Sequence, residues 1–174
     1  MNFTNVNLGP VLPESFLLIS VLSLLMLDLL LRDERCVAIH WLSVATLAGC
    51  GLFTVIDMQQ GTASVFLFNN MFVGDAMSRL LKLVVYLSAA TTLLYARDYL
   101  VARGMARVEF YSLALLAVLG MMVMISANHF MALYLGLELM SLSIYAMVAM
   151  QRDSSKATEA ALKYFVLGAL ASGM

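Results

Sequence analysis

Residues 128–150 decide the fold, and they read Asn-His-Phe-Met-Ala-Leu-Tyr-Leu-Gly-Leu-Glu-Leu-Met-Ser-Leu-Ser-Ile-Tyr-Ala-Met-Val-Ala-Met. This apolar stretch has about the length that crosses a bilayer as one helix. At about 1.5 Å of rise per residue, the Glu138 carboxyl lies roughly 14 Å from one end and roughly 18 Å from the other. A charged group at that depth costs about 2.5 kcal/mol or more, so such an acid usually faces a polar cavity or a partner. Glu138 therefore indicates a proton or ion path.

The composition indicates an integral membrane protein. Hydrophobic residues make up 63% of the chain and charged residues only 12%, which lies far outside the range of soluble globular domains. The net charge of −1 and the lack of a Lys/Arg cluster exclude a basic nucleic-acid surface. Cys36 and Cys50 are too few for a metal site or a disulfide framework, so we expect both to be small buried residues and expect no metal.

Apolar runs bounded by charged or turn residues predict about six transmembrane helices. The expected fold is an all-α polytopic bundle that forms a single transmembrane domain over residues 1–174. The loop 57–75 has the composition of an ordinary external turn region. The expected helices cover residues 16–31, 37–56, 77–96, 110–126, 129–150 and 156 onward.

The distribution of cations predicts the orientation. Arginine and lysine concentrate in the links 32–35, 97–107 and 152–156, whereas the amino-terminal tail and the link at Asn128 carry none. The positive-inside rule therefore places the amino terminus outside. The first helix has no preceding cation and is longer than a signal-peptide core, so we expect it to remain in the mature chain.

The last residues predict that the sequence stops inside its sixth helix. Residues 157–174 contain Glu159 and Lys163 but are otherwise mostly apolar, and no cationic flank or polar loop follows them. We therefore expect a truncated product or fragment; the alternative is a short chain that ends unusually at the membrane surface.

Two motifs in the last third of the chain carry a family resemblance. Residues 135–142 read Leu-Gly-Leu-Glu-Leu-Met-Ser-Leu, and residues 159–164 read Glu-Ala-Ala-Leu-Lys-Tyr. These motifs resemble the L-G-x-E-L-x-S-L and E-A-x-x-K-Y patterns of the subunit N family of proton-pumping NADH:quinone oxidoreductase, respiratory complex I. The sister antiporter-like subunits are less similar, because they tend to place an aromatic residue where this chain has Leu137.

The resemblance implies a membrane subunit that contributes to proton translocation coupled to quinone reduction. Glu138 and Lys163 take the positions of the family's buried Glu and helix-6 Lys. The family's lysine that faces this Glu lies on a seventh helix, beyond residue 174. The implied partners are other membrane and peripheral subunits of the complex, and the implied location is the bacterial inner membrane.

Redox chemistry is not expected in this chain itself. The sequence has no G-x-G-x-x-G dinucleotide motif and no cysteine set for an iron–sulfur cluster. We therefore expect no cofactor bound by this chain, while the complex as a whole uses NADH and quinone.

Residues around Glu138 complete the main candidate site. Tyr134 and Ser141 lie one turn away on either side and share its face, with hydroxyls available to the acid or to water. Lys163 is about 10 Å into the sixth helix. It can pair with Glu159 at spacing i, i+4, which fits either a surface ion pair or a proton relay.

Two further polar residues, Lys82 and His129, have two interpretations each. Lys82 lies about a turn and a half into its helix, where a cation that snorkels to the interface is the default and a channel role is the alternative. His129 begins its helix and can be an interfacial residue or a relay. Asp28 and Arg32 at spacing i, i+4 fit a structural pair.

Three hypotheses about function follow. The first is a proton-translocating subunit of NADH:quinone oxidoreductase. The second is a subunit of a multisubunit cation/proton antiporter, which would depend on Na⁺ or K⁺ without NADH. The third is a non-catalytic membrane scaffold or truncated remnant, in which Glu138 and Lys163 form a static buried pair.

Overall fold

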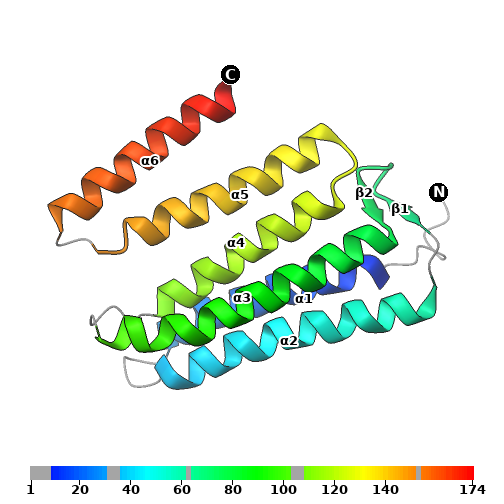
Figure 1. Cartoon of the computed structure of the whole chain (residues 1–174), viewed down its shortest axis with the longest axis horizontal. Coiled ribbons are helices and arrows are strands. Elements are labelled where there is room, and N and C mark those ends of the chain that lie inside the picture. Colours follow the sequence, from blue (N-terminus) through cyan, green and yellow to red (C-terminus); the bar gives the residue numbers. More distant parts are fainter. Residues whose placement is uncertain (1–8, 31–35, 62–63, 103–107, 152–153) are drawn as a thin grey trace.

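The computed structural model of the chain describes residues 9–30, 36–61, 64–102, 108–151 and 154–174. These residues form an all-α bundle with one small hairpin (Figure 1), as the sequence predicted. A 3₁₀ turn, η2 (Gly9–Val11), leads into the first helix. The helices are α1 (Leu12–Leu30), α2 (Cys36–Gln60), α3 (Ala76–Ala102), α4 (Val108–Ser126), α5 (Phe130–Val148) and α6 (Ser155–Gly173).

Five of these helices are long and apolar enough to cross a membrane. They are α1 to α5, so the described chain is an integral membrane protein. The sixth helix forms as predicted, but Lys156, Glu159 and Lys163 make it more polar, and its crossing stays a prediction. Most helices extend beyond their predicted bounds; α1, for example, begins at Leu12 because Pro13 is tolerated in a first helical turn.

The prediction that residues 57–75 form only a turn region was wrong. Strand β1 (Val65–Leu67) pairs antiparallel with β2 (Phe72–Gly74). The connecting residues Phe68, Asn69 and Asn70 all have positive φ, a conformation that Asn tolerates better than Phe. Strands of three residues are too short to show an alternating pattern in the sequence.

The hairpin is attached to the link between α4 and α5. The Asn128 N–H donates to the Met71 carbonyl at 2.9 Å, and Asn128 Nδ2 donates to the Asn70 carbonyl at 2.8 Å. Phe72 also forms a bridge with Ala127. The hairpin, which follows α2 and precedes α3 in the chain, is therefore attached to the start of α5.

The apolar core lies among α1, α2, α3 and α4. Its most deeply buried members come from three of these helices: Leu17, Leu24, Leu47, Cys50, Leu115 and Met122. Burial of Cys50 confirms its prediction, while the side chain of Cys36 lies outside the described residues. In Figure 1, α5 covers α4 and α6 forms the outer edge of the bundle, where it packs mainly against α5.

Glycines bring α4 and α5 into backbone contact. A Cβ added at Gly120 would lie 2.6 Å from the Met140 nitrogen and 2.7 Å from the Gly136 carbonyl oxygen. Only residues without a side chain permit such an approach. The close contact sets which face of α5 is turned away from the bundle.

Candidate functional site

Glu138 lies near the middle of α5, on the side away from α4. Gly136 and Met140 mark the face of α5 that contacts Gly120. At about 100° per residue, Glu138 is about 200° around the helix from Gly136. Its side chain is partly exposed in the isolated chain, and the ion pairs found among the described residues do not include it. The acid is thus available to a group outside α1–α4.

Tyr134 and Ser141 flank Glu138 on the same helix face. The α5 helix is continuous from Phe130 to Val148, so residues at i−4 and i+3 lie beside residue i. Tyr134 is exposed and Ser141 is partly buried. A role for either hydroxyl in proton transfer stays a prediction.

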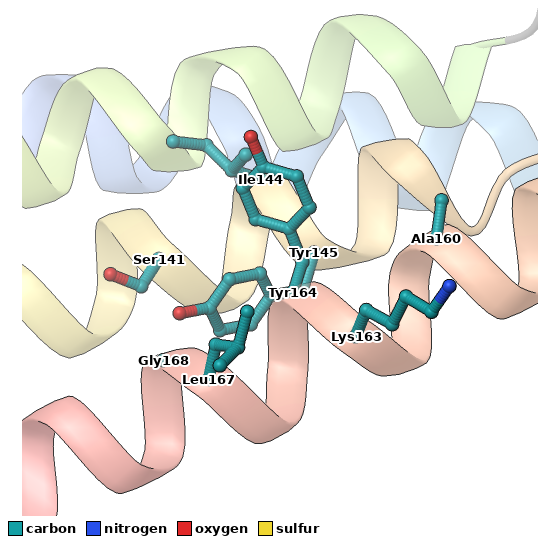
Figure 2. A pocket seen from close by; sticks show the side chains of 8 residues that line it. All are labelled: Ser141, Ile144, Tyr145, Ala160, Lys163, Tyr164, Leu167 and Gly168. Atoms are coloured by element: carbon teal, nitrogen blue, oxygen red, sulfur yellow. The ribbon is translucent and has the colours of Figure 1, made fainter.

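A cavity of about 700 Å³ lies between α5 and α6. Figure 2 shows that Ser141 lines it from α5 and that Lys163 runs along α6 toward Ala160, away from Ser141. Tyr145 and Tyr164 occupy its middle, with ring centroids 6.4 Å apart. The cavity is mainly apolar, and it brings together two of the predicted site residues, Ser141 and Lys163.

Lys163 pairs with Glu159 and not with Glu138. Its Nζ lies 2.6 Å from Glu159 Oε1, with both side chains about two-thirds exposed at 69% and 65%. The predicted i, i+4 pair is therefore confirmed. The static Glu138–Lys163 pair of the scaffold hypothesis is wrong for this structure, because the lysine ammonium is directed along its own helix.

His129 is the N-cap of α5. Its Nδ1 accepts a hydrogen bond from the Met131 N–H at 3.2 Å, and the side chain is exposed. This geometry favours a capping residue at the interface over a buried relay. The helix therefore starts at Phe130, one residue later than predicted.

The default interpretation of Lys82 as a snorkelling cation was wrong. Its side chain is buried in the bundle, forms an ion pair with Glu14 of α1, and lies over the Phe72 ring at 5.1 Å from the centroid. Sequence reasoning missed Glu14, which sits 68 positions away. The available signal was an acid in the first turn of an otherwise apolar helix.

A second ion pair lies beside the first. Arg79 Nε is 2.8 Å from Asp57 Oδ2, and Arg79 Nη1 donates to the Gly61 carbonyl at 2.6 Å. Asp75, just before α3, accepts a hydrogen bond from the Ser78 N–H at 2.7 Å. This bond lowers the pKa of the Asp75 carboxyl below its usual range.

Two other predictions concern metals and the end of α1. Among the residues that the structure describes, no three His, Cys, Asp or Glu side chains lie close enough to hold a metal ion. The predicted Asp28–Arg32 pair lies outside the residues whose side chains are described.

Comparison with known proteins identifies the chain's relatives. A family model described as NADH:quinone oxidoreductase/Mrp antiporter, transmembrane, matches residues 127–174. NADH-quinone oxidoreductase subunit N of Nitrosomonas europaea is 53% identical over 99% of this chain, and that of Thiobacillus denitrificans is 55% identical over 95%. The chain belongs to the subunit N family. It spans about a third of the length of these relatives, 36% and 34% respectively.

A solved structure of respiratory complex I from Thermus thermophilus with bound aureothin contains a similar fold. One of its chains matches 92% of this chain with a TM-score of 0.72 and 27% identity, and 34% of that chain is covered. The family model's match covers α5 and α6, which carry Glu138 and Lys163. The buried Glu14–Lys82 pair lies outside that match but inside the full-length similarity to subunit N.

Proposed function

We propose that this subunit N chain contributes to proton translocation coupled to quinone reduction in an NADH:quinone oxidoreductase. The observation that carries the proposal is the 53% identity to a curated subunit N over nearly the whole chain, together with an acid at the middle of α5. The enzyme activity belongs to the complex, which uses NADH and quinone, and this chain binds no cofactor of its own. Its partners are the other membrane and peripheral subunits.

The proposed chemistry is a change of charge at Glu138. An acid deep in a membrane span is costly when ionised, and a nearby cation offsets that cost. A cation that approaches or leaves would therefore release or load a proton. Tyr134 and Ser141 would supply hydroxyls to the path, and the Glu159–Lys163 pair on α6 would exchange charge with it. His129 would act at the entrance of α5.

A second candidate is a subunit of a multisubunit cation/proton antiporter. The description of the matching family model, which names the Mrp antiporter beside the oxidoreductase, favours keeping it. The two differ in an easily measured property. Proton transport by the antiporter depends on Na⁺ or K⁺, whereas transport by the oxidoreductase depends on NADH.

Glu138→Gln in the full-length subunit is the direct test. Glutamine keeps the size and some hydrogen bonds of the acid but cannot titrate, so the complex should assemble while coupled pumping falls. The measurement is the number of protons pumped per NADH oxidised, in membranes with matched amounts of assembled complex. Glu109→Gln, at an exposed acid in the first turn of α4, is the control and should leave the ratio unchanged. An unaltered ratio in Glu138→Gln would remove this acid from the proton path.

We also propose that the chain lies in the bacterial inner membrane with its amino terminus outside. The cation-rich links support this orientation. A reporter fused in the link 103–107 should be cytoplasmic, and a reporter at the amino terminus should be external. An external reporter in the link 103–107 would contradict the orientation.

A further inference from the structure

The polar cluster at the hairpin end of α1, α2 and α3 is the part of the molecule that the proposed function leaves unexplained. Four charged side chains meet there: Glu14, Asp57, Arg79 and Lys82. The side chains of Glu14 and Lys82 are only 9% and 3% exposed. Charged groups buried in a span are expensive, so each needs a full set of partners.

The protein does not supply all of these partners. A carboxylate accepts several hydrogen bonds and an ammonium donates three, yet Glu14 and Lys82 contact each other through a single oxygen, Oε1. Glu14 Oε2 has no hydrogen-bond partner among the described residues. The Lys82 ammonium also lies over the Phe72 ring, 5.1 Å from its centroid, and an aromatic ring accepts hydrogen bonds only weakly.

Tyr86 brings another unpartnered group to the same place. It lies one turn beyond Lys82 on α3, is 4% exposed, and interacts electrostatically with Glu14. Its hydroxyl has no hydrogen-bond partner among the described residues. The neighbouring Thr54 hydroxyl, whose oxygen interacts with the Tyr86 side chain, donates to the Cys50 carbonyl at 2.9 Å. Two α3 side chains and one α1 side chain thus direct polar atoms toward one region.

The charges define the class of ligand. The two acids and two bases of the cluster cancel, so the region attracts neither a free cation nor a free anion. Small neutral molecules that both donate and accept match the unpartnered carboxylate oxygen, ammonium and hydroxyl. Buried water typically makes two to four such bonds to otherwise unsatisfied groups.

We propose that Glu14, Lys82 and Tyr86 form an internal water-binding site. The water donates to Glu14 Oε2 and accepts from the Lys82 ammonium or the Tyr86 hydroxyl. On the hairpin side of these residues, Arg79 pairs with Asp57 and donates to the carbonyl of the exposed Gly61. The site is separate from the α5 face and does not rest on the proposed function.

Radiolytic labelling of the chain in lipid nanodiscs tests this site. X-ray pulses split water into hydroxyl radicals, which oxidise side chains next to bound water even where bulk solvent cannot reach. Tyr86 should be oxidised several-fold faster than Tyr111, which is 1% exposed in the apolar core. Tyr95, 85% exposed on the same helix as Tyr86, calibrates the radical dose.

Two outcomes decide the proposal. Tyr86 oxidation no faster than that of Tyr111 would show a dry cluster and overturn it. The double variant Glu14→Leu/Lys82→Met, which removes the polar partners, should lower the Tyr86 rate to that of Tyr111 while Tyr95 is unaffected. An undiminished Tyr86 rate in that variant would likewise overturn the assignment of these two residues to the site.

Discussion

Lys82→Met should lower the free energy of unfolding of the chain by about 3 to 5 kcal/mol, because it leaves the buried Glu14 carboxylate without its cation. This is the largest single effect that we expect. The measurement is unfolding by denaturant in a fixed detergent micelle or lipid nanodisc, followed by the loss of helical signal. The Phe72 ring also loses its contact with the Lys82 ammonium, which adds to the loss of stability.

Two variants separate a buried pair from an ordinary one. Glu14→Leu/Lys82→Met removes both charges, so it should recover most of the stability lost in the single variant. Lys163→Met breaks an exposed i, i+4 pair and should change the stability by about 0.5 kcal/mol or less. Equal effects of Lys82→Met and Lys163→Met would contradict the burial of the Glu14–Lys82 pair.

Gly120→Ala should destabilise the bundle by about 1 to 3 kcal/mol, although alanine is the better helix former by about 1 kcal/mol. The added Cβ would meet the backbone of α5 at Met140 and Gly136. Backbone atoms cannot rotate away as a side chain can, so α4 and α5 must separate. The expected result is a lower unfolding midpoint.

Gly173→Ala is the matched control for this contact. Nothing lies within 4 Å of a Cβ added at Gly173, so the substitution should be neutral or slightly stabilising. Gly136→Ala, on the opposite side of the contact with Gly120, should behave like Gly120→Ala. If Gly120→Ala is as stable as the unmodified chain, the two helices do not pack through their glycines.

The six helices and the membrane environment could be predicted from the sequence. Long apolar runs have few alternatives in a bilayer, because every backbone polar group must be satisfied within the segment. The i, i+4 pair of Glu159 and Lys163 was also predictable, since helical geometry alone brings the two together. Glu138 was singled out by its depth in α5, although its proton-transfer role stays a prediction.

Other features depend on contacts between residues far apart in the chain. The partner of Lys82 comes from the start of α1, and no local pattern links it with position 14. The hairpin has strands of only three residues and is held by the distant Asn128.

The amino-acid sequence by itself determined which segments are helical and which acid lies deepest in a span, because hydrophobic length and helical spacing are local properties. Tertiary structure alone decided that Lys82 is a buried partner of Glu14 rather than a snorkelling cation. It also decided which face of α5 turns Glu138 away from α4, because Gly120 and Gly136 allow the two backbones to touch. Burial and pairing of a charge depend on what the rest of the chain packs against it, and that information is spread over the whole sequence.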